Sequence, residues 1–122
     1  MIIEIQKPAI VRVAYRQEPG DATYGSCLWA YYDFDVAKGI LTIQSDCGFY
    51  HYRWPEKNDD FLHLMAGVDS DYLEEKLLMS VNKPGRPQKA WVRRVAEIYG
   101  AHIRPIIRQA WEEKTDGKQD ED

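Results

Sequence analysis

A carboxylate, a thiol and an imidazole stand close together in the sequence, at Asp46, Cys47 and His51. A cysteine activated by a histidine is the pairing that nucleophilic catalysis uses. Here Gly48 directly follows the cysteine and indicates a tight turn, so the thiol lies in the turn and the imidazole on the strand that leaves it. The two side chains then point in different directions, and no third residue is placed to orient the histidine. We therefore expect no catalytic residues and interpret the protein as a non-enzyme.

The histidines and cysteines show no spacing that is typical of metal ligands. His51, His63 and His102 lie far apart, and none has a histidine or cysteine three or four residues away. Cys27 and Cys47 form no Cys-x-x-Cys motif, and a single pair is too few to indicate a disulfide framework. We expect no metal site and no cofactor, and we interpret both cysteines as free thiols in a reducing cytoplasm.

Positive charge is concentrated in residues 83–108, which hold 7 Lys/Arg and one acidic residue. Residues 1–82 carry a net charge of −6 and residues 109–122 a net charge of −4, so the whole chain has a net charge of −4. Lys89 and Arg93 are four residues apart, a like-charge spacing that costs a helix about 0.2–0.5 kcal/mol. Phosphates or an acidic partner would offset this cost, and so would carboxylates within the protein. The basic candidates for partner binding are Lys83, Arg86, Lys89, Arg93, Arg94, Arg104 and Arg108.

Alternating aromatic residues form the second candidate for a binding surface. Tyr50, Tyr52 and Trp54 share one face of a predicted strand, because side chains alternate along a strand. The opposite face carries Phe49, His51 and Arg53. One face has to pack against helices, and the sequence leaves open which. Large amphipathic side chains on an outer face are enriched in protein interfaces, so Tyr50, Tyr52 and Trp54 are candidate partner-binding residues. Core packing and cross-strand pairing explain the same pattern.

Four segments with a period of two precede Pro55 and predict β-strands. Pro19-Gly20 separates the first two strands, Gly39 the next two, and the turn Asp46-Cys47-Gly48 the last two. Connections this short join antiparallel neighbours and predict a meander of three or four strands. The predicted strands are residues 9–16, 26–35, 40–45 and 49–54.

After Pro55 the period of the apolar residues changes to about 3.6, which predicts helices. Asp59 or Asp60 can cap a short helix that ends at Gly67, and Asp69 or Ser70 can cap the next helix.

Two further helices are predicted in the basic segment and beyond. The first covers roughly residues 88–99, with Trp91 on its apolar face, and stops at Gly100. The second starts at Pro105, because Arg104 is biased away from helix by the proline that follows it. We therefore predict an α+β fold: a three- to four-stranded antiparallel meander packed on one side by about four C-terminal helices. Residues 1–114 form a single domain, and residues 115–122 form a disordered acidic tail.

The hairpin and the helix starts resemble a family of small phage- and prophage-encoded proteins of unknown function. The resemblance lies in the pattern G-x-L-x-I-x-S-D-x-G-x-Y-x-Y-x-W, followed by D-F-L and D-x-D-Y-L helices. In this sequence the pattern falls on Gly39, Leu41, Ile43, Ser45, Asp46, Gly48, Tyr50, Tyr52, Trp54, Asp60-Phe61-Leu62 and residues 69–73. It implies a phage or mobile-element protein, and it supplies no catalytic residues.

Small phage proteins of this kind often bind host machinery. We therefore expect a non-enzymatic accessory protein that binds a host or phage protein or nucleoprotein, such as an anti-CRISPR-like inhibitor of a host defence system. The alternative is a nucleic-acid-binding module that uses the basic surface of residues 83–108. No run approaches the roughly 20 apolar residues of a membrane span, so we expect a protein of the bacterial cytoplasm.

Overall fold

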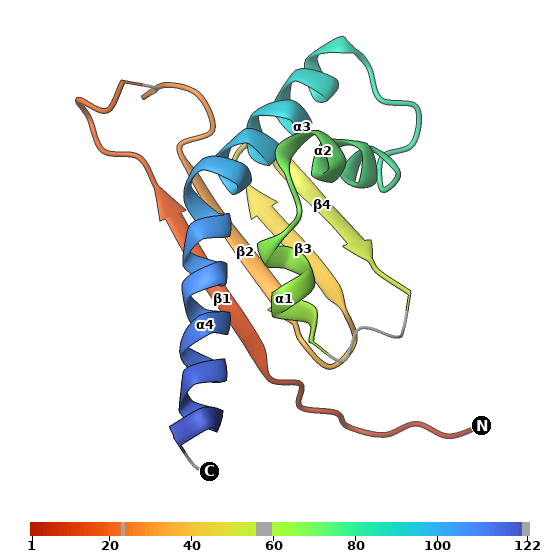
Figure 1. The fold of residues 1–122 in the computed structure, drawn as a ribbon. Coiled ribbons are helices and arrows are strands. Elements are labelled where there is room, and N and C mark those ends of the chain that lie inside the picture. Colours follow the sequence, from red (N-terminus) through yellow and green to blue (C-terminus); the bar gives the residue numbers. More distant parts are fainter. Residues whose placement is uncertain (23, 56–59, 121–122) are drawn as a thin grey trace.

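The computed structural model describes residues 1–22, 24–55 and 60–120 of the chain. Four strands form one antiparallel sheet in the order β1-β2-β3-β4 (Figure 1). Each strand pairs with its neighbour in the sequence, so the predicted meander and the predicted α+β fold are confirmed. The strands are β1 (Ile10–Arg16), β2 (Trp29–Asp35), β3 (Ile40–Ser45) and β4 (Gly48–Arg53).

The helices gather on one face of the sheet (Figure 1). They are α1 (Phe61–Ala66), α2 (Ser70–Leu78), α3 (Arg86–Ile98), the π-helical turn η1 (Tyr99–Ile103) and α4 (Arg104–Asp120). Among the described residues, no helix combines the length and the apolar character that a membrane crossing needs.

The starts of the first two helices follow from their caps. The Asp60 carboxylate accepts a hydrogen bond from the His63 N–H, and the Asp69 carboxylate accepts one from the Tyr72 N–H. Each cap satisfies a backbone donor that has no partner inside the helix. Gly67 ends α1, as predicted. The alternative cap at Asp59 lies outside the described residues.

The predicted break at Gly100 is wrong, because the chain continues from α3 through η1 into α4. Pro105 cannot donate a hydrogen bond within a helix, and its ring needs space in the preceding turn. The wider π turn provides this space: the Arg104 N–H donates to the Tyr99 carbonyl, five residues earlier. Gly100 serves close packing instead, since a Cβ at this position would collide with the Ser70 hydroxyl at the start of α2.

Helix α4 also extends further than predicted. Its backbone is helical to Asp120, whereas we predicted disorder from Thr115. A polar composition shows that a segment has little to bury, but a helix that is already nucleated propagates through residues such as Glu, Lys and Gln at little cost. The rest of the predicted tail, residues 121–122, lies outside the described residues.

A disulfide between Cys27 and Cys47 ties the start of β2 to the β3–β4 turn. The prediction of free thiols is therefore wrong, and the inference of a reducing compartment loses that support. The Asp46 carboxylate strengthens the same junction by accepting hydrogen bonds from the backbone N–H groups of Leu28 and Trp29, at 2.9 and 3.3 Å. The cysteines have a sequence separation of 20, so no local pattern indicates this contact, which the pairing of the strands creates.

Three buried tyrosines link the sheet to the helices and the turn. The Tyr32 hydroxyl donates to the Val95 carbonyl at 2.8 Å, and the Tyr99 hydroxyl donates to the Met65 carbonyl at 2.5 Å. Tyr50, like the other two tyrosines, is at most 1% exposed, and its hydroxyl donates to the Cys47 carbonyl within the hairpin. Burial raises the pKa of all three phenols above the ordinary value near 10.

These tyrosines predict a loss of stability in alkali. Because the pKa of each phenol is higher in the folded than in the unfolded state, the contribution of the three phenols to the free energy of unfolding is complete below about pH 10. This contribution falls as the pH rises above that value. Urea unfolding between about pH 8 and pH 11 measures this slope. Tyr32→Phe is expected to flatten the slope, and Tyr31→Phe, on the exposed face, is the control. Identical slopes in the two variants would contradict the assignment.

Candidate partner-binding surface

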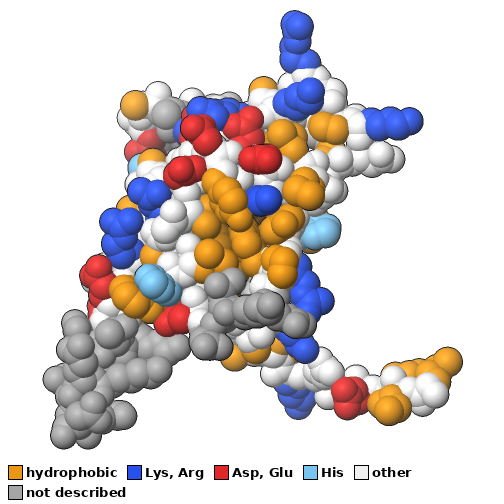
Figure 2. Space-filling model, turned by 45° about the vertical axis from the view of Figure 1, so that its right-hand side comes forward, with side chains coloured by type: hydrophobic (Ala, Val, Ile, Leu, Met, Phe, Trp, Pro, Cys, Tyr) orange, Lys and Arg blue, Asp and Glu red, His pale blue; other side chains and the backbone are white. Residues whose placement is uncertain are grey.

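The aromatic candidates from the hairpin lie on the covered face of the sheet. Tyr50 is 1% exposed and Trp54 is 5% exposed, so the prediction that they contact a partner is wrong for these two residues. Trp54 donates its indole N–H to the Tyr72 hydroxyl at 3.0 Å. Tyr52 is half-buried, and the Lys76 ammonium lies 5.6 Å from its ring centre. Figure 2 brings forward this side of the molecule, where hydrophobic side chains gather below a group of acidic ones.

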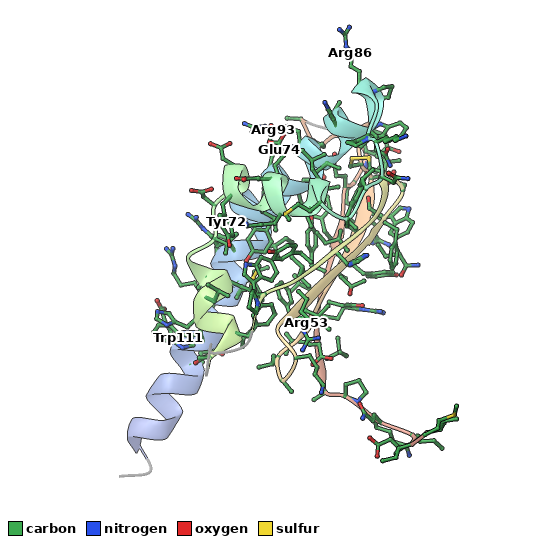
Figure 3. All side chains as sticks on the ribbon, turned by 90° about the vertical axis from the view of Figure 1, so that its right-hand side faces the viewer. Arg53, Tyr72, Glu74, Arg86, Arg93 and Trp111 are labelled. Atoms are coloured by element: carbon green, nitrogen blue, oxygen red, sulfur yellow. A yellow bond between two sulfur atoms is a disulfide. The ribbon has the colours of Figure 1, made fainter. Side chains whose placement is uncertain are left out.

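In the part of the chain that the structure describes, no helix lies on the opposite face of the sheet, and the side chains of that face point into solvent (Figure 3). We call this surface, formed by the outward side chains of β1 to β4, the open face. Its large rings are Trp29 and Tyr31, both 38% exposed, and Phe49, 60% exposed. A row of directly paired residues crosses the whole sheet from Ala14 through Tyr31 and Gln44 to Phe49. The open face therefore presents two aromatic residues in one row.

A second row of the open face joins charged and polar side chains. Arg12 pairs with Asp33, which in turn pairs with Thr42 and then His51. The Arg12 guanidinium donates two hydrogen bonds to the Asp33 carboxylate, at 2.7 and 2.9 Å. It also lies 4.6 Å from the ring centre of Tyr31. The hydrogen bonds and the charge of Asp33 raise the pKa of Arg12. Because the two charges balance, this row has little net charge.

A signal for the open face is present in the sequence of β2, outside the hairpin. In β2, Trp29 and Tyr31 alternate on the same side as Asp33 and Asp35. Carboxylates are rarely buried without a partner, so this acidic pair marks the solvent side of the strand and hence of the two rings. The pairing register then places Phe49 of β4 on the same side.

The basic candidates do not form one surface, and Arg93 shows why. Its guanidinium lies 2.8 Å from Asp71, 2.6 Å from Glu74 and 2.9 Å from Glu97 (Figure 3). Hydrogen bonds to Glu74, Asp71 and Glu97, in that order of size, raise the pKa of Arg93. The like-charge cost of Lys89 and Arg93 is therefore offset inside the protein, by carboxylates of α2 and α3.

Three further arginines also bind groups of the protein itself. Arg94 lies 3.9 Å from Glu97. Arg104 donates to the Val68 carbonyl at 3.4 Å, and Arg108 donates to the Ala66 carbonyl at 3.2 Å. Carbonyls at a helix C-terminus attract positive charge, so Arg108 holds α4 against the end of α1, while Arg104 contacts the link between α1 and α2. The candidates that remain exposed without such contacts among the described residues are Lys83, Arg86 and Lys89, around the start of α3.

Cys47 and Asp46, two of the hairpin residues that were considered for catalysis, have structural roles. The Cys47 sulfur is bonded to Cys27, and the Asp46 carboxylate caps the start of β2. Within the described part of the chain, no three His, Cys, Asp or Glu side chains are grouped in a way that could hold a metal ion. A shallow cavity of about 210 Å³ lies between α1 and α4, where His63 stacks on Trp111.

Trp91 departs from its predicted place in the core. Its side chain is 49% exposed, although Val92 and Val95 of the same helix are fully buried. The apolar face of α3 is therefore narrower than the periodicity indicated.

The fold and this surface define a small α+β protein whose four-stranded meander is covered by helices on one face only. The chain belongs to a phage family: the family model Phage_phiTE_072, described as a phage family, matches residues 23–115. No curated protein and no solved structure matches the sequence. The predicted phage origin is thereby confirmed. The matched residues include Trp29, Tyr31 and Phe49 of the open face.

Proposed function

We propose that this phage protein is a non-enzymatic accessory protein that binds a host or phage protein through its open face. The observation that carries the proposal is the exposure of three large rings, those of Trp29, Tyr31 and Phe49, on a sheet face without a cover. Aromatic residues and arginine are the types enriched at the core of protein interfaces, and the Arg12 guanidinium lies over the ring of Tyr31. Inhibition of a host defence system is a role that such binding would serve.

The balance of charge on this face favours a protein over a nucleic acid. Arg12 is neutralised by Asp33, and Arg16 lies 3.1 Å from Glu18. Affinity for nucleic acids comes largely from unpaired positive charge that displaces counterions from phosphates. The alternative, a nucleic-acid-binding module on residues 83–108, now rests on Lys83, Arg86 and Lys89, because the other four arginines of that segment contact acidic groups or carbonyls of the protein.

The double variant Tyr31→Ser/Phe49→Ser tests this proposal. Removal of two rings from the centre of an interface is expected to weaken partner binding at least about 30-fold, since central aromatic residues contribute most to affinity. The free energy of unfolding should change by no more than about 1 kcal/mol, because both side chains are exposed and their shared cross-strand neighbour, Gln44 of β3, is polar. Affinity purification from host lysate with mass spectrometry identifies the partner, and titration calorimetry with the purified partner measures the affinity.

The matched control is Lys83→Glu/Arg86→Glu/Lys89→Glu, which changes the exposed basic residues and leaves the open face intact. We expect this variant to keep the wild-type partner. The result that overturns the proposal is the reverse pattern, in which the basic variant loses binding, together with retention of the wild-type protein on DNA or RNA in a salt-dependent manner.

A further inference from the structure

The residues before Pro8 form an apolar arm with nothing to pack against in the described structure. Met1, Ile2, Ile3 and Ile5 are between 86% and 111% exposed. The arm, residues 1–7, runs away from the body of the protein beyond the start of β1 (Figure 1). β-branched residues such as isoleucine favour extended backbone. An exposed, extended and apolar segment of this kind indicates an interaction site.

Strand β1 provides an edge on which such a segment could pair. It is the first strand of the sheet, and among the described residues it has a strand neighbour only on the β2 side. An edge strand presents a row of backbone donors and acceptors that an extended chain can satisfy. On its covered side β1 carries Val11, 38% exposed, and the half-buried Val13 and Tyr15. An added strand would form hydrogen bonds with the backbone of this edge and would cover its apolar side chains.

The arm cannot reach β1 of its own chain through a tight hairpin. Only Pro8 and Ala9 separate the arm from Ile10, so the loop would have two residues. Two-residue hairpin loops need a positive φ at their first residue, whereas proline holds φ near −65°. Pro8 therefore disfavours pairing of the arm with its own strand, and the arm runs away from β1 (Figure 1). The edge of β1 in another molecule is then the strand edge that the arm could meet.

We propose that residues 1–7 add as a strand to the edge of β1 in a second copy of the protein, and that the exchange is reciprocal. Two copies of the segment 1–16 then run antiparallel, with Pro8 of one facing Pro8 of the other at a two-fold axis. Because the exchange is symmetric, both arms are buried in a closed dimer rather than in an open chain of molecules.

The alternation of side chains selects the register. With Pro8 at the axis, Ile3 lies opposite Val13 and Ile5 opposite Val11, so that both isoleucines cover the partly exposed apolar side of the edge. Glu4 then lies opposite Arg12, a pairing of opposite charges on the open face. A shift by one residue would place Glu4 opposite Val13 on the apolar side, and Ile3 and Ile5 opposite Ala14 and Arg12 on the open face. This register is disfavoured because it moves a charge to the apolar side and the isoleucines to the solvent side.

Sedimentation equilibrium of the full chain over a concentration series tests the dimer. We expect twice the monomer mass for the wild type and the monomer mass for a variant that lacks residues 2–7, with unchanged circular dichroism. Ile3→Lys/Ile5→Lys should likewise lose the dimer. Gln6→Lys is the matched control and should keep it, because Gln6 faces the solvent side in the proposed register. A monomeric wild type, or a dimer that persists without the arm, overturns the proposal.

Cysteine cross-linking tests the register itself. In the proposed dimer Ile2 lies opposite Ala14, so Ile2→Cys/Ala14→Cys should give a covalent dimer on mild oxidation, seen by non-reducing electrophoresis. Ile3→Cys/Ala14→Cys is the control and should give little cross-link, since these side chains lie on opposite faces. Equal cross-linking of both pairs, or capture of a different protein by the arm in place of a second copy, would overturn the pairing.

Discussion

Gly48→Val is expected to lower the free energy of unfolding by about 3 kcal/mol. Gly48 opens β4 with a φ of 126°, a conformation that a β-branched residue adopts only under strain. A Cβ here would also lie 2.7 Å from the Cζ of Tyr50 and would collide with its hydroxyl. Tyr50 is 1% exposed, and its hydroxyl donates to the Cys47 carbonyl at 2.6 Å. The new side chain would therefore displace a buried ring and break a buried hydrogen bond.

Gly20→Val is the control for the backbone part of this effect. Gly20 has a φ of 107°, but a Cβ at this position would meet no atom within 4 Å. We expect it to lose about 1–2 kcal/mol, from strain alone. Urea unfolding of both variants gives the comparison. Equal losses would show that Tyr50 does not restrict the turn, and a Gly48→Val variant as stable as the wild type would refute the turn conformation.

Removal of the Cys27–Cys47 disulfide is the second change with a large expected effect. The bond closes a loop over a sequence separation of 20 residues, and the resulting restriction of the unfolded chain stabilises the fold by about 3 kcal/mol. The reduced protein should keep its fold at room temperature, because Asp46 still holds the backbone of Leu28 and Trp29. We expect a lower melting temperature in the presence of dithiothreitol, measured by circular dichroism.

The control is Cys27→Ala/Cys47→Ala, which cannot form the bond. Its melting temperature should equal that of the reduced wild type to within a few degrees and should not respond to reductant. If dithiothreitol leaves the melting temperature of the wild type unchanged, the thiols are free, as the sequence alone suggested.

Elements with a local cause could be predicted from the sequence. The four strands follow from the alternation of side chains and from glycine-containing turns, and the starts of α1 and α2 follow from Asp60 and Asp69. Each of these features depends on residues a few positions apart, which the sequence shows directly. The break predicted at Gly100 is wrong because the glycine is needed for close packing against Ser70, thirty positions away, and does not end its own helix.

The candidate site depended on contacts that no local pattern contains. Tyr50 and Phe49 are both aromatic and adjacent, so the sequence determined that they point to opposite faces of the sheet. Only the packing of the helices decided that Tyr50 is buried and Phe49 exposed. Likewise, the sequence determined that Arg93 and Lys89 lie near each other on a helix. The carboxylates of Asp71 and Glu74 that neutralise Arg93 belong to another helix, and they reach it only because α2 packs beside α3. Strand alternation and helix caps are local properties of the backbone, whereas burial and charge pairing are set by which elements meet in space.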